Sequence, residues 1–291
     1  MLKYYYKIIM LGETIINIVM VCIYTSKGLN LRIKKENESE RIHILGNGPS
    51  LMKDITEILD FLKKSKNDKV MVVNSFANYD LFEKIKPSYY ILADPAFFIE
   101  TKLARIEILK EKIANSLLDT TDWDLILLLP SNAKKSDFVQ KLKTNKHISI
   151  HYFKSRAIIG GFQGLNNILF KHGLASPLYQ NVLIPSIFLS IKMGYSKIIL
   201  WGADHSWHEG YTLGRDNNIH TEDKHFYSDS EEGSFIHCNI DGTPIKVHEI
   251  FSTLSRAFKI YQSLESFSKT VNCNIFNLSS KTWIDAFKRE Y

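Results

Sequence analysis

Cysteine is scarce in this sequence, with three residues among 291. Cys22, Cys238 and Cys273 stand far apart and have none of the short spacings that thiolate metal sites require. Chains built on a disulfide framework are usually richer in cysteine. We therefore expect a reducing compartment and predict a cytoplasmic location.

Signatures of several protein classes are also missing. Gly46 and Gly48 form a Gly-x-Gly pair, but Leu-Met-Lys follows at residues 51–53, where a dinucleotide fingerprint needs its third glycine. The sequence has no Walker-type phosphate loop and no His-Glu-x-x-His zinc motif. Basic residues are spread along the chain without a nucleic-acid motif, so we predict no nucleic-acid partner.

Size and charge narrow the possibilities further. The chain is 45% apolar and carries a formal net charge of +6, which suits an anionic substrate or an anionic membrane surface. We find no internal repeat and no low-complexity tract. A chain of this length can bury one large core, so we expect one main domain over residues 39–291 with an appendage over residues 1–38.

The chain is organised around the turn at residues 46–50. An apolar, strand-like run over residues 42–45 stops at Gly46, and a helical pattern begins at Leu51. Two glycines let the backbone turn tightly and present N–H groups to an anion, and Ser50 can cap the helix that follows. We expect this turn to bind a phosphate-bearing ligand.

Strand-like and helical patterns alternate along the rest of the chain. The order predicts an α/β fold with a mostly parallel, twisted sheet that is covered by helices on both faces. Residues 157–180 are rich in glycine and are a candidate lid. The expected strands cover residues 69–74, 89–94, 124–129, 148–153, 197–204 and 274–278, and the expected later helices cover residues 184–191, 248–270 and 283–289.

Small polar residues close several of these strands. Asn74, Asp94 and Asp204 each stand at the carboxyl end of a predicted strand. In a parallel sheet these ends share one edge, so the side chains are expected to meet the turn at residues 46–50 in one crevice.

A long polar loop or lid is predicted over residues 205–246, after the most apolar strand. It is rich in histidine and aromatic residues. His205, His208 and Glu209 could supply part of a metal site, one histidine could serve as a general base, and most of the others fit an exposed loop. The pair Asp122 and Asp124 precedes its strand, where the Asp-x-Asp motif of metal-dependent glycosyltransferases is not expected.

The amino-terminal region is unusually apolar from residue 8 to residue 24, with lysine and arginine on both flanks. Glu13, Thr14 and Asn17 interrupt the apolar run and fall on one helical face. No small-residue cleavage site of a signal peptide follows. We expect an amphipathic helix that lies on the inner membrane or packs on the domain, and an ordinary core helix is the alternative.

Several stretches resemble the small bacterial sialyltransferases that modify lipooligosaccharide, and more loosely the flagellin-modification and pterin diphosphokinase-like proteins. The resemblance extends over about residues 42–210. Its motifs are Gly-Asn-Gly-Pro-Ser-Leu at residues 46–51, Asn-Ser-Phe at 74–76, Asp-Pro-Ala-Phe-Phe at 94–98, and the run from Gly194 to Asp204.

The resemblance implies a GT-A-like sialyltransferase variant that moves a sugar from a nucleotide donor, with a CMP-linked donor favoured. Asp94 stands where the family carries asparagine, and the family's Thr-Ser-Gly turn is replaced near Asn181, so Kdo or a neutral sugar also stays possible. The implied donor-binding residues are Gly46, Asn47, Gly48, Ser50, Asn74, Asp94, Asn181 and Gly202.

The family's catalytic base is a histidine shortly before the late helix. His248 fits this position and His225 competes with it, while Asp204 and His205 are further catalytic candidates. Tyr211 or Tyr227 could replace the family's tyrosines that stabilise the leaving phosphate. The implied reaction is a metal-independent, inverting transfer to a hydroxyl of a surface glycan or of a lipid-linked oligosaccharide, without a cofactor.

Two other functions stay open at this point. A pyrophosphoryl transferase of the pterin diphosphokinase type would need Mg²⁺ and acidic ligands such as Asp94 and Asp204. A non-catalytic module would bind the nucleotide sugar without turnover. We make no prediction of the oligomeric state.

Overall fold

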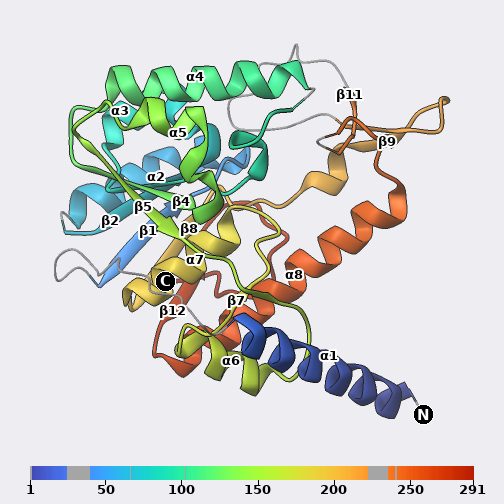
Figure 1. The fold of residues 1–291 in the computed structure, drawn as a ribbon. Helices are drawn as coiled ribbons and strands as arrows, with labels where there is room; N and C mark the ends of the chain where they lie inside the picture. The colour runs from blue at the N-terminus through green and yellow to red at the C-terminus, as the bar shows by residue number, and fades with distance from the viewer. Residues whose placement is uncertain (1, 25–39, 66, 102, 222–234, 240) are drawn as a thin grey trace.

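The computed structural model describes residues 2–24, 40–65, 67–101, 103–221, 235–239 and 241–291. Within them a seven-stranded, entirely parallel sheet has the order β12-β8-β1-β2-β3-β4-β5 (Figure 1). This confirms the predicted α/β fold with a parallel sheet. The strands are β1 (Arg41–Leu45), β2 (Lys69–Val73), β3 (Tyr89–Ile91), β4 (Leu125–Pro130), β5 (Ile148–Phe153), β8 (Lys197–Trp201) and β12 (Asn274–Asn277).

Helices cover both faces of the sheet (Figure 1). Successive strand residues alternate between two cores, as Ile198 and Leu200 of β8 pack into one and Ile199 and Trp201 into the other. The core of Ile199 is closed by α2 (Ser50–Lys64), α3 (Asp80–Ile85), α4 (Ala104–Thr120) and α5 (Asp137–Leu142). The core of Ile198 is closed by α6 (Gln163–Lys171), α7 (Leu183–Met193) and α8 (Val247–Thr270).

The order of the strands in the sheet reverses direction at β1. The chain adds β2, β3, β4 and β5 on one side of β1, and then returns to place β8 and β12 on the other side. Helices that follow β1 and β8 therefore leave toward opposite faces, and the loops after these two strands separate. In open α/β sheets such a switch point leaves a crevice at the carboxyl ends of the strands.

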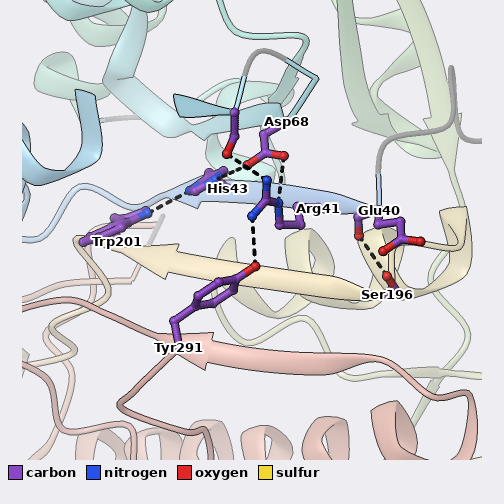
Figure 2. A network of polar contacts seen from close by, with 8 residues as sticks. Glu40, Arg41, His43, Asp68, Ser196, Trp201 and Tyr291 are labelled. Atoms are coloured by element: carbon purple, nitrogen blue, oxygen red, sulfur yellow. Dashed lines mark hydrogen bonds and ion pairs between the residues drawn. The ribbon is translucent and has the colours of Figure 1, made fainter. Parts of the chain in front are cut away.

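A buried polar network also joins β1 to β8 (Figure 2). Trp201 Nε1 donates to His43 Nδ1 at 3.0 Å, so the other ring nitrogen of His43 carries the proton and donates to Asp68 Oδ2 at 3.1 Å. Arg41 Nε donates to Asp68 Oδ1 at 2.9 Å, and Arg41 Nη1 donates to the Tyr291 hydroxyl at 3.0 Å. The network links the central strand to its neighbour and to the last residue of the chain.

The predicted helix over residues 283–289 is wrong. The segment runs irregularly along β12, where Asn277 N donates to Lys288 O at 2.7 Å and Phe276 pairs with Lys288. Trp283 N donates to Asp204 O at 2.8 Å. These bonds to distant backbone groups replace the local bonds that a helix would need.

The two candidate lids contain regular structure. Residues 157–180 include β6 (Ala157–Ile158), α6 and β7 (Ser176–Pro177). The region after β8 contains η4 (Trp207–Gly210) and a three-stranded antiparallel sheet of β9 (Tyr211–Leu213), β10 (Ile219–Thr221) and β11 (Phe235–Ile236). Lid movement over residues 205–246 stays a prediction.

Candidate functional site

A pocket of about 790 Å³ lies at the switch point between β1 and β8. Its walls come from the ends of β1, β2, β3 and β8, from the start of α7, from the small antiparallel sheet and from α8. Its volume lies in the usual range of ligand sites. The predicted site residues that line it are Gly46, Asn47, Gly48, Ser50, Asn74, Asp94, Asn181, Gly202, Asp204, His205 and Tyr211.

Three predicted site residues are not among those lining residues. His248 is exposed on the first turn of α8, because that helix turns Thr253, Leu254 and Ala257 toward the pocket instead. The structure therefore does not bring His248 into the pocket. His225 and Tyr227 lie outside the described residues.

The glycine turn is held against the end of β8 by backbone contacts. Gly46 N donates to Trp201 O at 2.8 Å and Gly48 N donates to Gly202 O at 2.9 Å. A Cβ on Gly46 would lie 2.5 Å from Gly202 O, so only glycine allows this approach. These two N–H groups already have carbonyl partners, so they are not available to a phosphate, and phosphate binding by the turn stays a prediction.

The Asp204 side chain lies against the first residue of α2. Its Oδ2 accepts from Ser50 N at 3.0 Å and its Oδ1 accepts from Ser50 Oγ at 2.5 Å. Burial raises the pKa of the Asp204 carboxyl, while the Ser50 hydrogen bonds act in the opposite direction. We expected Ser50 to cap its own helix, but its side chain makes no capping hydrogen bond. The anion at this helix terminus is instead the Asp204 carboxylate of the protein itself.

Buried side-chain amides without a hydrogen-bond partner in the described structure line the pocket. They are both polar atoms of Asn47, Oδ1 of Asn74, Oε1 of Gln180 and Nδ2 of Asn181. Asn74 also has a left-handed backbone with φ of 50°, which is uncommon outside glycine. Since buried polar atoms are normally paired, these amides indicate a polar ligand.

Hydrogen bonds around Asn181 set the protonation of a buried histidine. Asn181 Oδ1 accepts from Leu183 N at 3.0 Å and from Ile184 N at 3.3 Å, which identifies this atom as the oxygen. The Tyr261 hydroxyl donates to the same oxygen at 3.0 Å and is in contact with His205 Nε2. The Tyr261 hydroxyl has one proton, which it donates to Asn181, so the proton in its hydrogen bond with His205 must belong to His205 Nε2. In the neutral ring, Nδ1 of His205 therefore keeps a lone pair.

His205 is held in a single, neutral form. Its backbone is left-handed with φ of 52°, and its ring stacks on Trp207 at 4.2 Å between centroids. Burial lowers the pKa of His205 to about 3, so the imidazole is uncharged at neutral pH. A neutral imidazole with a lone pair can accept a proton from a bound hydroxyl when an anionic ligand beside it offsets the burial that disfavours its charged form.

Three basic residues line the pocket together with the acidic residues. Lys53 comes from α2, Arg105 from α4, and Lys281 from the segment after β12. Lys281 Nζ pairs with Glu209 Oε2 at 2.5 Å, and the Arg105 guanidinium lies 3.9 Å from the centroid of the Phe235 ring. Lys53, on the first turn of α2, and Arg105 can therefore receive an anionic group that enters the pocket.

Sequence reasoning missed Gln180, Tyr261 and the three basic residues. Gln180 precedes α7 in a segment that we could not assign, and Tyr261 lies in the middle of α8. A tyrosine at helical spacing carries no local signal that distinguishes a site residue from a core residue. Tyr261 is both, because it is fully buried and bonded to two pocket side chains.

Asp94 and Asp204, two acidic residues of the pocket, already accept hydrogen bonds from neighbouring protein groups. Both Asp204 oxygens accept from Ser50, and Asp94 Oδ1 accepts from Ala96 N at 2.9 Å, which caps η2 (Pro95–Phe97). Over the described ranges, no group of three or more histidine, cysteine, aspartate or glutamate side chains could hold a metal ion.

No protein-family profile matches the sequence, and a search of curated proteins finds no match. Among solved structures, the chain is similar to the MAf glycosyltransferase from Magnetospirillum magneticum AMB-1, with 13% sequence identity and a TM-score of 0.46. The match covers 88% of this chain and 34% of that chain, so this chain spans about a third of the length of that protein.

We predict that Gly48→Ala lowers the free energy of unfolding by roughly 2 kcal/mol or more, as overpacking does. The new Cβ would lie 2.2 Å from Asp204 Oδ1. The matched control is Gly164→Ala in α6, where nothing lies within 4 Å of the added atom. Urea unfolding measures both. Equal stability of the two variants would contradict the close packing of the turn.

We predict that His205 makes stability depend on pH. Its pKa is about 3 in the fold against 6.5 in the unfolded chain, so the unfolded chain binds more protons between these values. Stability therefore falls as the pH drops below 6.5, by up to about 1.4 kcal/mol per pH unit from this residue. The unfolding free energy of His205→Gln, measured from pH 7.5 down to pH 5, should fall less steeply. Parallel curves would refute the prediction.

Proposed function

We propose that the chain is a glycosyltransferase that binds a nucleotide-linked sugar in the pocket between β1 and β8 and transfers the sugar to a hydroxyl group. The observation that carries this proposal is the set of buried amide atoms of Asn47, Asn74, Gln180 and Asn181 that line the pocket without a hydrogen-bond partner among the described residues. Side-chain amides both donate and accept hydrogen bonds, as the edges of a nucleobase and the hydroxyls of a sugar require.

The phosphate of the donor would lie toward the basic residues of the pocket. The start of α2 already holds the Asp204 carboxylate, which would repel a second anion there. Lys53 and Arg105 provide the positive charge instead, while the charge of Lys281 is balanced by Glu209. The resemblance of the sequence to sialyltransferases favours a CMP-linked donor, and the acceptor would be a surface glycan or a lipid-linked oligosaccharide.

His205 is our candidate for the catalytic base. The acceptor oxygen would attack the anomeric carbon from the side opposite the phosphate, so that the new C–O bond forms as the bond to the phosphate oxygen breaks and the configuration inverts. The hydroxyl proton would pass to Nδ1 of His205, and the negative charge on the departing phosphate would stabilise the imidazolium that results. We propose that this transfer needs no metal ion.

The alternative pyrophosphoryl transfer has less support. It would use Asp94 and Asp204 as magnesium ligands, and binding a metal through Asp204 would break two hydrogen bonds to Ser50 at the start of α2.

We predict that one class of nucleotide sugar raises the melting temperature of the protein, as a ligand specific for the folded state does. CMP-, UDP-, GDP- and CDP-linked sugars would be compared by thermal shift. Asn181→Asp keeps an oxygen for the amides of α7 but removes the Nδ2 donor and adds a negative charge, so the affinity for the donor should fall at least about tenfold.

The control is Asn217→Asp, the same change at an exposed turn outside the pocket lining. It should bind the donor as the wild type does. If no nucleotide sugar binds, or if Asn181→Asp binds as tightly as the control, the donor site proposed here is wrong.

We predict that His205→Gln lowers turnover by roughly 10²-fold or more, since a general base contributes about this factor, while the donor-induced thermal shift is retained. The release of free nucleotide with candidate acceptors measures turnover, with and without EDTA. The matched variant is His248→Ala, which alters an exposed histidine and should keep full activity.

Loss of activity in His248→Ala with full activity in His205→Gln would move the base to His248. Loss of wild-type activity in EDTA would favour the magnesium-dependent alternative. Donor binding without turnover for any acceptor would identify a non-catalytic binding module.

A further inference from the structure

Helix α1 (Leu2–Tyr24) packs on the domain along one narrow stripe and exposes the rest of its surface. It lies beside α6 and extends away from the domain (Figure 1). Thr14, Asn17 and Val21 are buried in the stripe. The exposed large apolar side chains of the helix are Tyr4, Tyr5, Tyr6, Ile8, Ile9, Leu11, Ile15, Ile16, Ile18, Val19, Met20 and Ile23.

Three polar side chains of α1, those of Glu13, Thr14 and Asn17, bind the domain. Glu13 Oε2 accepts from Gly161 N at 2.7 Å, and Thr14 Oγ1 accepts from Phe162 N at 2.9 Å. Asn17 Nδ2 donates to Ile159 O at 3.3 Å. The Glu13 carboxylate lies at the start of α6, where the helix dipole favours a negative charge. The three residues that interrupt the apolar run are therefore docking groups.

The turn that receives α1 is shaped to fit it. Gly160 and Gly161 have φ of 60° and 80°, which side chains rarely adopt. A Cβ on Gly160 would lie 2.1 Å from Glu13 Oε2, and one on Gly161 would lie 2.9 Å from Thr14 Oγ1. The contact therefore requires glycine at both positions, for backbone conformation and for space.

The apolar surface continues from α1 onto the domain. Ile159 and Phe162 flank the glycine pair of the receiving turn, and Ile168 follows in α6. These side chains are 52%, 40% and 54% exposed. We call α1 together with Ile159, Phe162 and Ile168 the α1 surface. It exceeds the scattered apolar exposure of an ordinary soluble surface.

Charge and aromatic residues point to the occupant of this surface. The segment Tyr4–Ile23 is long and apolar enough to cross a membrane, yet it is mostly exposed, unlike the core helix of a soluble domain. Three consecutive tyrosines stand near its start, and tyrosine favours the membrane–water boundary. Lys3 and Lys7 precede most of the apolar run, and Lys27, Arg32, Lys34 and Lys35 follow it in the sequence.

We propose that the α1 surface binds an anionic phospholipid bilayer, with α1 lying in the plane of the interface. The apolar side chains would enter the outer edge of the hydrocarbon region, and Lys7, which is exposed on the same helix, would meet the anionic headgroups. An orientation across the bilayer is disfavoured, because it would break the bonds of Glu13, Thr14 and Asn17 to the domain and move a carboxylate into hydrocarbon.

Cosedimentation with vesicles tests the proposal. The full chain should bind vesicles of phosphatidylcholine with phosphatidylglycerol, and should bind those of phosphatidylcholine alone more weakly. The double variant Ile16→Glu, Val19→Glu changes two exposed side chains away from the docking stripe, so the domain keeps its fold. We expect its vesicle affinity to fall at least about tenfold, because charged groups oppose insertion.

The matched control is the double variant Ile108→Glu, Leu213→Glu, which makes the same change at two exposed residues outside the α1 surface. It should bind vesicles as the wild type does, and all three proteins should share one melting temperature. The proposal fails if the wild type does not bind, if the α1 variant binds equally well, or if light scattering shows α1-dependent oligomers that vesicles do not dissociate.

A fluorophore on α1 distinguishes the two orientations. The carrier is Ile16→Cys with Cys22→Ser and Cys238→Ser, and Cys273 stays unlabelled because burial raises the pKa of its thiol to about 12. Position 16 lies near the middle of the apolar segment. Spin labels close to the headgroup should quench the fluorophore more strongly than labels at the acyl-chain end. The reverse order would mean that α1 crosses the bilayer and would overturn the in-plane arrangement.

Discussion

The pocket depends on the contact between the backbone after β1 and the backbone after β8. Gly46 and Gly202 approach so closely that a Cβ on either would meet the carbonyl oxygen of the other, at 2.5 Å and 2.8 Å. With Cβ atoms at these positions the two turns would separate, and Asp204 could no longer reach Ser50. The two glycines therefore allow the turns after β1 and β8 to pack together, and this contact fixes the positions of the side chains that these turns present to the pocket.

The same contact determines how the pocket can recognise a ligand. The carbonyl oxygens of Trp201 and Gly202 accept from two amides of the turn, and Asp204 accepts from the amide of Ser50. The N–H groups that the sequence suggests for anion binding are therefore bonded within the protein. Recognition then depends on side-chain amide atoms that have no partner among the described residues, such as both polar atoms of Asn47 and Nδ2 of Asn181. A site of this kind selects by hydrogen-bond pattern and leaves charge neutralisation to its basic residues.

Local patterns in the sequence were sufficient to predict the strands of the central sheet and the convergence of their carboxyl ends, but not the short strands β6, β7, β9, β10 and β11. Asn74, Asp94 and Asp204 do line one pocket, since the carboxyl ends of parallel strands share an edge. The sequence could not indicate that Ser50 bonds to a residue 154 positions away, or that residues 283–289 bond to distant backbone instead of coiling. Tyr261 and His248 illustrate the same limit, because both lie on α8 and only Tyr261 is buried. Helical spacing in the sequence does not show which residues of distant segments pack against each position.

The pocket and helix α1 differ in which groups lack a partner: polar atoms in the pocket, and apolar side chains on α1. In the pocket, buried amide atoms have no hydrogen-bond partner among the described residues, which calls for a polar ligand. On α1 the polar side chains are satisfied by the turn at Gly160 and Gly161, and the apolar ones are uncovered, which calls for an apolar phase. Because an unpaired buried amide and an exposed isoleucine each cost free energy in water, the two surfaces require different partners. A membrane-bound enzyme that takes a soluble donor would need both.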